Sequence, residues 1–203
     1  MILSDFSKKV LNEFVLNNMI PNIIHLPQRT DRLDLLTGEL QNQDIFEYRI
    51  WDGIIDPIIT AKGISQAHKQ IVKYAQKEKI QETVIIEDDV HFTAKGAFQF
   101  FIKNKPSDYD IYLGGIYEGD IKTDNVVDDF SGLTIYVINE RFYDIFLSMP
   151  KSVNLDRALS NKGKFIVCNP FIAIQHNGFS DNLKRFCNYE ECLNGRNLYG
   201  IGS

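Results

Sequence analysis

A short apolar run that ends in three consecutive carboxylates most constrains how this chain can fold. Residues 83–86 read Thr-Val-Ile-Ile, and Glu87, Asp88 and Asp89 follow directly. A wholly apolar stretch of this length is typical of a central strand that is covered on both faces of a sheet. In open α/β sheets, ligands bind outside the carboxyl ends of the strands. The sequence therefore predicts that the three carboxylates lie at the ligand-binding edge of such a sheet.

Segments typical of strands and of helices alternate along the chain. Strands are expected near 22–26, 45–50, 83–86, 110–113, 134–138, 165–168 and 171–174, and helices near 33–40, 62–79, 94–103, 139–146 and 154–159. This alternation predicts a single α/β domain over 1–203, with a mixed, mostly parallel sheet flanked by helices. Residues 1–20 are expected to carry an N-terminal helix, and residues 182–203 to form a loosely structured tail.

The composition excludes several classes of protein. Because 44% of the residues are hydrophobic and 12% are aromatic, the chain has enough core material for a folded domain. Its net charge is −5 and it has no basic run, which argues against binding of duplex nucleic acid through the backbone. The 3 Cys are too few for a disulfide framework, and neither a secretory signal nor an apolar transmembrane segment is recognisable. We therefore expect a soluble, cytoplasmic protein.

The three adjacent carboxylates need compensation. Two carboxylates about 4 Å apart repel each other by roughly 4 kcal/mol at an effective dielectric constant of 20. Solvent, protonation, a basic side chain or a cation can relieve this repulsion. Mn²⁺ or Mg²⁺ would be suitable, because these hard ions take oxygen ligands and leave positions open for phosphate. The alternative is a solvated acidic turn in which Asp88 or Asp89 caps the following helix. If the strand stays extended, Glu87 and Asp89 point to one side and Asp88 to the other.

Seven short motifs follow one another along the chain: 23–32 (IIHLPQRTDR), 51–53 (WDG), 63–68 (GISQAH), 84–90 (VIIEDDV), 134–138 (TIYVI), 154–156 (NLD) and 170–175 (PFIAIQ) followed by 180–181 (SD). In this order they resemble the motifs of glycosyltransferase family 25, which includes bacterial lipooligosaccharide galactosyltransferases and procollagen galactosyltransferases. Seven motifs in the family's order are more specific than any one of them. The resemblance implies a GT-A-like fold, a UDP-sugar donor, Mn²⁺ dependence and inversion at the anomeric carbon.

The acidic run and the resemblance together indicate the candidate site residues. We expect Asp89 to contact the metal directly, and Glu87 to bind either the metal or the donor. His176 follows the last motif and is the expected late metal ligand, or else an ordinary histidine of a surface loop. The residues expected to bind the donor are Leu26, Arg29, Arg32, Asp52, Gly53, His68, Glu87 and Asp88.

Two arginines follow the first strand. Arg29 and Arg32 are expected to face the diphosphate of the donor, because guanidinium groups bind phosphate through paired hydrogen bonds. The alternative for Arg32 is an ion pair with Asp31 or Asp34 on the surface of the following helix.

Three further candidates also have ordinary alternatives. Asp52 and Gly53 either lie against the nucleoside or form a turn. His68, on a helix that leads into the acidic strand, either packs in the core or contacts the substrate.

An attacking hydroxyl needs a base, because a neutral alcohol is a poor nucleophile. Asp156, at the start of a short helix, is the candidate base. Its alternative is to accept hydrogen bonds from free N–H groups of that helix.

These inferences favour a metal-dependent glycosyltransferase that moves a hexose, galactose or glucose, from a UDP-sugar to a hydroxyl of a glycan or protein. A catalytically silent binding or scaffold module is the main alternative. A metal-dependent phosphotransfer or receiver-type domain also places carboxylates at strand ends, but usually on earlier strands. A modified nucleic-acid base is a further candidate acceptor.

Overall fold

The computed structural model describes residues 19–201, so the predicted N-terminal helix lies outside the described residues. In chain order the elements are β1 (Asn22–His25), α2 (Thr30–Asn42), β2 (Arg49–Asp52), α3 (Thr60–Lys77), β3 (Glu82–Glu87), β4 (Val90–Phe92), α4 (Ala97–Lys103), β5 (Ile111–Leu113), the 3₁₀-helix η1 (Thr123–Asn125), β6 (Val126–Val127), β7 (Ile135–Asn139), η2 (Glu140–Phe142), α5 (Tyr143–Ser148), α6 (Leu155–Leu159), β8 (Phe165–Val167), β9 (Ala173–Gln175), β10 (Gly178–Ser180), β11 (Arg185–Cys187) and η3 (Glu190–Leu193).

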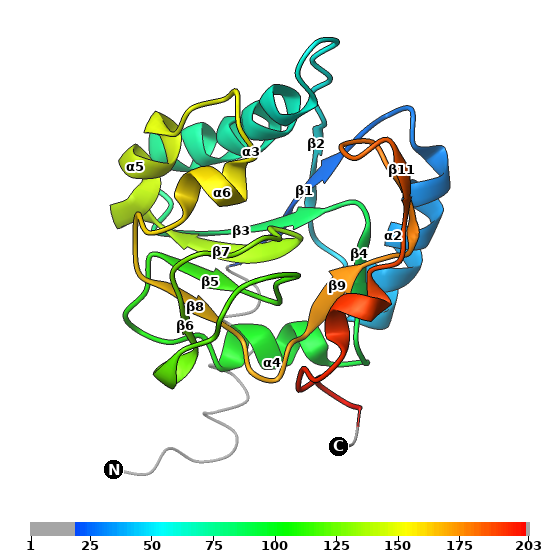
Figure 1. Cartoon of the computed structure of the whole chain (residues 1–203), viewed down its shortest axis with the longest axis vertical. Coiled ribbons are helices and arrows are strands. Elements are labelled where there is room, and N and C mark those ends of the chain that lie inside the picture. The colour runs from blue at the N-terminus through cyan, green and yellow to red at the C-terminus, as the bar shows by residue number, and fades with distance from the viewer. Residues whose placement is uncertain (1–18, 202–203) are drawn as a thin grey trace.

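Within residues 19–201, seven strands form one sheet in the order β2-β1-β3-β7-β5-β8-β6 (Figure 1). β1 is parallel to its neighbours β2 and β3, and β5 is parallel to β8. β7 is antiparallel to both β3 and β5, and the short edge strand β6 is antiparallel to β8. The predicted fold class, an α/β domain with a mixed, mostly parallel sheet, is therefore confirmed.

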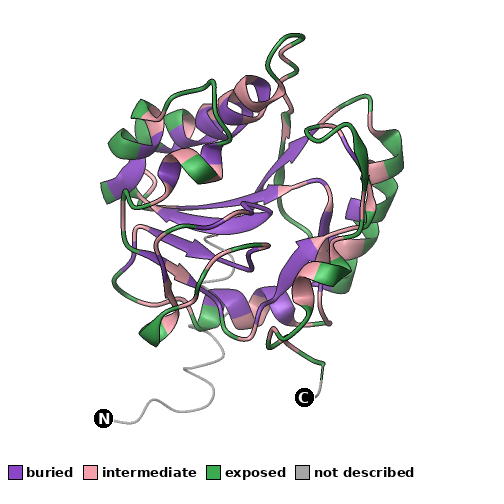
Figure 2. Ribbon diagram, viewed as in Figure 1, coloured by how far each residue is buried: buried purple, intermediate pink, exposed green. Residues whose placement is uncertain are grey.

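Helices cover both faces of this sheet. Figure 1 shows α3, α5 and α6 on one face, with α4 on the other. The side chains of β3 alternate between two apolar clusters: Ile85 packs in the cluster that contains residues of α3, and Val84 and Ile86 pack in the cluster that contains residues of α2 and α4. These three side chains are at most 1% exposed, which confirms that β3 is covered on both sides (Figure 2). Among residues 19–201, no helix combines the length and the apolar character needed to cross a bilayer.

The second strand of the sheet begins later than its sequence predicts. The expected strand over 45–50 is replaced by β2, which starts at Arg49. Ile45 is buried, and its backbone N–H donates to the carbonyl of Leu40 at 2.9 Å. Ile45 therefore closes the end of α2, which explains why apolar content alone placed the strand too early.

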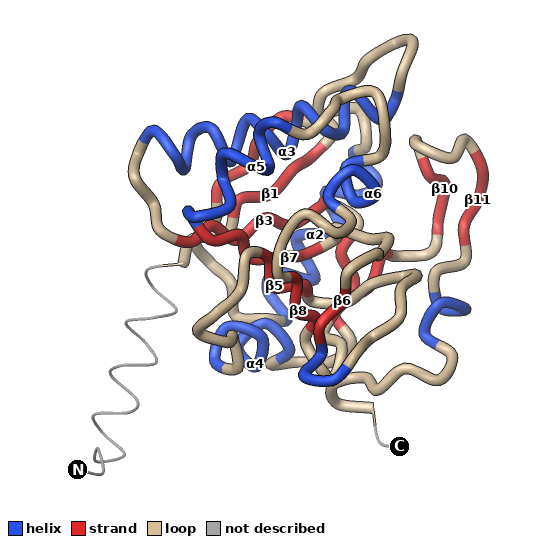
Figure 3. Tube along the Cα trace, turned by 60° about the vertical axis from the view of Figure 1, so that its left-hand side comes forward, coloured by secondary structure: helices blue, strands red, loops and turns tan. Residues whose placement is uncertain are grey.

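The segment 182–201 is more regular than the expected loose tail. β11 pairs with β10 in an antiparallel hairpin that stands beside the main sheet (Figure 3). Further on, the backbone N–H of Tyr199 donates to the carbonyl of Phe171 at 2.9 Å. The last described residues are thus connected to the rest of the domain by backbone hydrogen bonds.

Gly63 and Gly38 allow a matched test of the packing of α3. A Cβ at Gly63 would lie only 2.1 Å from the backbone oxygen of Ile54, whereas a Cβ at Gly38 in α2 would meet nothing within 4 Å. We expect Gly63→Ala to lower the free energy of unfolding by about 1–3 kcal/mol, because backbone must move to admit the methyl group. Gly38→Ala should raise it by about 0.5–1 kcal/mol through the better helix propensity of alanine. Urea denaturation measures both, and equal effects at the two positions would contradict the close approach at Gly63.

Candidate functional site

The acidic run lies where β3 leaves the sheet. β3 ends at Glu87, and the chain turns through Asp88 and Asp89 before β4 begins. The expected alternation of the three side chains required an extended backbone through Asp89. Because the strand stops at Glu87, Asp88 and Asp89 instead reach the same guanidinium group, that of Arg32.

Asp88 is buried and connects the ends of two parallel strands. Its Oδ2 lies 2.8 Å from Nδ1 of His25 and accepts the backbone N–H of Leu26 at 3.1 Å. Its Oδ1 accepts a hydrogen bond from Nη1 of Arg32 at 2.8 Å. Both oxygens are therefore engaged by groups of the protein itself. Buried charges are stable only when paired and hydrogen-bonded in this way.

Asp89 is only partly compensated. Its Oδ2 lies 2.9 Å from Nη1 of Arg32, while its Oδ1 is buried and has no hydrogen-bond partner among the described residues. Burial and the negative charge of Glu87 raise the pKa of Asp89 to about 8, against the opposing effect of Arg32. Asp89 therefore has one buried oxygen atom that no group of the described residues engages.

Glu87 is held by two side chains, those of His68 and Gln175. Its Oε1 lies 3.2 Å from Nε2 of His68, and its Oε2 accepts a hydrogen bond from Nε2 of Gln175 at 2.8 Å. Burial is the largest single effect and acts to raise the pKa of Glu87, but the hydrogen bonds with His68 and Gln175 and the charges of His68 and Arg32 together outweigh it and hold the pKa below its ordinary value. His68 is itself buried, with Nδ1 2.9 Å from the hydroxyl of Tyr136. His68 thus connects the core to the acidic run.

The two arginines lie at the N-terminal end of α2. Arg29 is the residue that precedes α2, and its Nη1 donates to Oδ2 of Asp181 at 2.5 Å. Arg29 also pairs with Asp31, whereas the ion pairs of Arg32 with Asp31 or Asp34 that were considered from the sequence do not form. Nη2 of Arg32 donates to the backbone oxygen of Phe179 at 3.2 Å. Both guanidinium groups therefore lie between the acidic run and the hairpin.

A cavity of about 300 Å³ lies between these arginines and the β10–β11 hairpin. It is lined by Arg29, Asp31, Arg32, Leu35, Asp88, Asp89, His176, Asn177, Gly178, Phe179, Ser180, Phe186 and Tyr189. This volume is at the lower end of the range found for small-molecule sites. Positively and negatively charged side chains meet in it.

Three predicted donor-binding residues lie at the ends of β1 and β2. His25 is opposite Asp52 in the parallel pair, so Leu26 and Gly53 are the next residues beyond the strands. A Cβ at Gly53 would lie 2.7 Å from Cδ2 of Leu26, which explains why this position has a glycine. The side chain of Asp52 is exposed. None of Leu26, Asp52 and Gly53 lines the cavity described above.

Gln175 and His176 are consecutive residues whose side chains lie on opposite faces of the β4–β9 ladder. In the antiparallel pair β4–β9, Val90 lies opposite Gln175, and successive side chains of a strand alternate between its faces. Gln175 therefore reaches Glu87, while Nε2 of His176 lies 3.1 Å from Oε1 of Glu39 on the other face. His176 also lines the cavity, and its backbone N–H donates to the carbonyl of Asp89 at 2.7 Å.

The predicted metal ligands are consequently not gathered in one place. Glu87 is engaged by His68 and Gln175, and His176 is turned away from it by strand alternation. Within residues 19–201, the one set of three His, Cys, Asp or Glu side chains that could share an ion is Glu39, His91 and His176. Of the predicted set, Asp89 alone keeps a buried oxygen without a partner in this part of the chain.

Asp156 lies in the first turn of α6 and outside the cavity lining. Its Oδ2 accepts hydrogen bonds from the hydroxyl of Ser131 at 3.1 Å and from the backbone of Gly132 at 3.0 Å. Its Oδ1 accepts the backbone N–H of Arg157 at 2.8 Å. Of these donors only the backbone N–H of Arg157 belongs to α6, so the ordinary alternative is met by one contact, and the role of Asp156 as a base stays a prediction.

Sequence reasoning missed the contribution of the hairpin. The cavity wall includes Phe179, Phe186 and Tyr189, from a stretch with weak periodicity and no recognisable motif. Sequence reasoning also missed Glu39, because a glutamate within a helix does not by itself indicate a binding site. Gln175 belongs to a matched motif, so its place in the motif was the available indication.

Comparisons with known proteins give weak likenesses. No protein-family model matches the chain, and no curated protein matches its sequence. Among solved structures, HddC from Yersinia pseudotuberculosis complexed with GMP-PN matches with a TM-score of 0.44 and 14% identity over 77% of this chain and 93% of that one. A197 from STIV matches with a TM-score of 0.48 and 11% identity, over 91% of this chain and 96% of that one. A glycosyltransferase involved in glycosylation of the major capsid of PBCV-1 matches with a TM-score of 0.38 and 12% identity, over 63% of each chain. Likenesses of this size carry no argument about what the chain binds.

The strained environment of Asp89 predicts that its replacement stabilises the metal-free protein. The pKa of about 8 exceeds the ordinary value of 3.8, so the folded state binds more protons between these values and loses stability as the pH rises through them. We expect Asp89→Asn to abolish this loss and to raise the free energy of unfolding at about pH 8 by about 1–3 kcal/mol. Urea denaturation across the pH range measures the effect.

Asp34→Asn is the matched control, because Asp34 is an exposed carboxylate on the same helix as Arg32. It should change the free energy of unfolding at about pH 8 by less than about 0.5 kcal/mol. If Asp89→Asn changes it no more than this, Asp89 is ionised without cost in the folded protein, which contradicts a strained environment of Asp89.

Proposed function

We propose that this chain is a metal-dependent glycosyltransferase with a GT-A-like fold, similar to family 25. It would move a hexose, galactose or glucose, from a UDP-sugar to a hydroxyl of a glycan or protein, with inversion at the anomeric carbon. The observation that carries the proposal is the cavity at the end of β3, where two arginines lie beside a carboxylate with a buried, unpartnered oxygen among the described residues.

The arginines support binding of the donor's diphosphate. Arg29 and Arg32 both line the cavity at the N-terminal end of α2. Guanidinium groups bind phosphate oxygens through paired hydrogen bonds, and the N-terminus of a helix favours anions. A diphosphate in the cavity would compete with Asp31 and Asp181 for Arg29.

The residues present fit a hard divalent ion, Mn²⁺ or Mg²⁺, that has few protein ligands. Asp89 offers one buried oxygen, and ions that bind together with phosphates commonly take one or two carboxylates from the protein. Since Arg32 already neutralises the other oxygen of Asp89, the remaining ligands would be phosphate and water. When bound, the ion would supply charge stabilisation to the leaving diphosphate.

The remaining roles are extensions of this proposal. Leu26, Asp52 and Gly53, at the ends of β1 and β2, would hold the nucleoside. Asp156 would act as the base toward the acceptor hydroxyl. Glu87 and Asp88, whose oxygens are engaged by protein groups, would act on the donor by positioning His68 and Arg32.

A catalytically silent module that binds a nucleotide sugar is the second candidate. It is favoured by the complete engagement of Asp88 and by the hydrogen bonds that already occupy Asp156. Both candidates need the same cavity, so turnover is what distinguishes them.

A thermal-shift panel with UDP-galactose and UDP-glucose, with and without Mn²⁺, tests binding, and release of UDP tests turnover. We expect one UDP-sugar to raise the melting temperature only when Mn²⁺ is present. Asp89→Asn should remove this dependence and slow UDP release by about a hundredfold or more, because several kcal/mol of charge stabilisation would be lost. Asp34→Asn, the exposed carboxylate used above, should behave as the wild type.

Metal-dependent binding without UDP release from any acceptor mixture would favour the silent module. If no nucleotide sugar changes the melting temperature, the proposed function is wrong.

A further inference from the structure

A second cluster of metal-ligating side chains lies beside the cavity. Oε1 of Glu39 is 2.7 Å from Nδ1 of His91 and 3.1 Å from Nε2 of His176. The ligand atoms of these three residues all lie within 4.8 Å of one another. In a tetrahedral zinc site with bonds of about 2.0–2.2 Å, ligand atoms are about 3.4 Å apart. To reach this spacing, Oε1 of Glu39 would move away from Nδ1 of His91 by about 0.7 Å and from Nε2 of His176 by about 0.3 Å.

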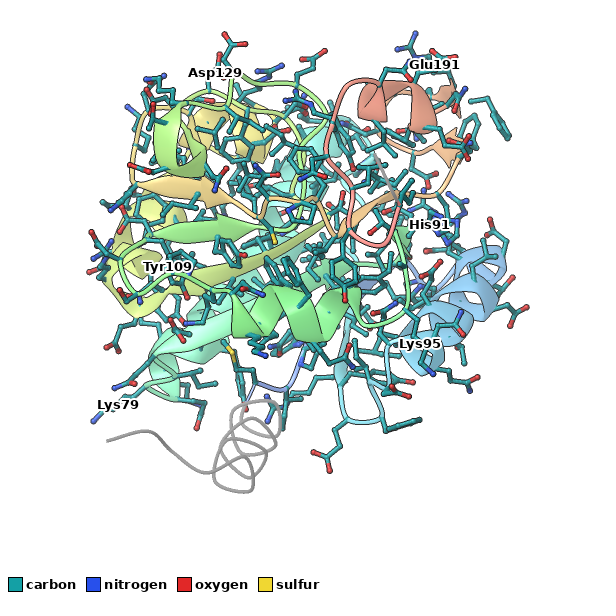
Figure 4. All side chains as sticks on the ribbon, turned by 90° about the horizontal axis from the view of Figure 1, so that it is seen from below. Lys79, His91, Lys95, Tyr109, Asp129 and Glu191 are labelled. Carbon is teal, nitrogen blue, oxygen red and sulfur yellow. The ribbon has the colours of Figure 1, made fainter. Side chains whose placement is uncertain are left out.

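The fold brings the three residues together from separate elements. His91 in β4 pairs with Ile174 of β9, so His176, two residues further along, lies on the same face as His91. Their rings are 4.5 Å apart between centroids. α2 packs along β4 and supplies Glu39. Figure 4 labels His91, which lies next to α2.

Glu39 is held in place by a further contact. Its Oε2 accepts the backbone N–H of Phe92 at 3.1 Å, which leaves Oε1 directed at the two imidazole rings. Ligating carboxylates in metal sites are typically oriented by such hydrogen bonds.

His176 provides an independent observation. Its Nε2 is buried, and its contact with Oε1 of Glu39 at 3.1 Å lacks the alignment of a full hydrogen bond, so this nitrogen is incompletely satisfied among the described residues. A buried polar atom without a partner is uncommon in folded proteins and calls for an explanation such as an ion. A metal on this nitrogen would satisfy it.

We propose that Glu39, His91 and His176 form a separate site for a divalent transition metal, with Zn²⁺ as the best match. Two imidazole nitrogens and one carboxylate oxygen suit zinc, whereas magnesium, calcium and manganese prefer oxygen ligands. His91 is half-exposed, so the fourth position is accessible to water. This site differs from that of Asp89 in both its ligands and its preferred ion.

The position of the ion gives it a defined effect on the cavity. His176 lines the cavity and bonds through its backbone to Asp89, and α2 carries Arg32 as well as Glu39. Zinc would therefore connect the helix that carries the arginine to the strand end that borders the hairpin. It orders this wall of the cavity.

Titration of the metal-free full chain with Zn²⁺, followed by calorimetry, tests the proposal, and Co²⁺ provides a spectroscopic probe. We expect one ion per chain, and for Co²⁺ the strong visible absorption of a four-coordinate site. His91→Gln and Glu39→Gln should each weaken Zn²⁺ binding by about a hundredfold or more. Their melting temperatures without metal show whether each variant is folded.

Two controls separate this site from others. Asp89→Asn should bind Zn²⁺ as the wild type does, whether or not its response to Mn²⁺ and UDP-sugar is lost, so the two proposals can fail independently. Cys187→Ser with Cys192→Ser should also keep full Zn²⁺ affinity, which excludes the partly buried thiols. The proposal is overturned if folded His91→Gln and Glu39→Gln bind Zn²⁺ unchanged, if the thiol variant loses binding, or if the wild type binds no Zn²⁺.

Discussion

Three carboxylates in a row, at the end of a strand whose apolar side chains are fully buried, impose the main electrostatic constraint on this protein. Each charge needs its own compensation, because the desolvation of an unpaired carboxylate costs several kcal/mol. Arg32 is shared by Asp88 and Asp89, while His68 and Gln175 hold Glu87. Much of the surrounding structure supplies the hydrogen bonds and positive charges that offset the desolvation and mutual repulsion of these carboxylates.

The compensation is uneven among the three carboxylates. Asp88 is saturated and connects β1 to β3, so it contributes to the stability of the sheet edge. Asp89 retains an oxygen without a partner in the described part of the chain, beside two arginines and above a cavity. Proteins commonly keep such locally unfavourable groups where a ligand completes the arrangement.

The parts that the sequence predicted well are those with local patterns. Alternating apolar segments identified β3 and its burial, because side-chain period and strand length are properties of adjacent residues. The ion pairs of Arg32 with Asp88 and Asp89 were not predicted, because they depend on the parallel pairing of β1 with β3, which no local pattern specifies. The separation of His176 from Glu87 and the inclusion of Glu39 depend on the pairing of β4 with β9, which joins segments about eighty residues apart and has no local signature.

The short ladder between β4 and β9 has an evolutionary consequence. Because Gln175 and His176 occupy consecutive positions, a single-residue insertion or deletion just before them would exchange their faces. After a deletion, His176 would take the position of Gln175 beside Glu87, and after an insertion, Gln175 would take the position of His176 beside His91. Length changes in this part of the chain should accordingly be far less tolerated than point substitutions, since one such change would disarrange two chemically different centres together.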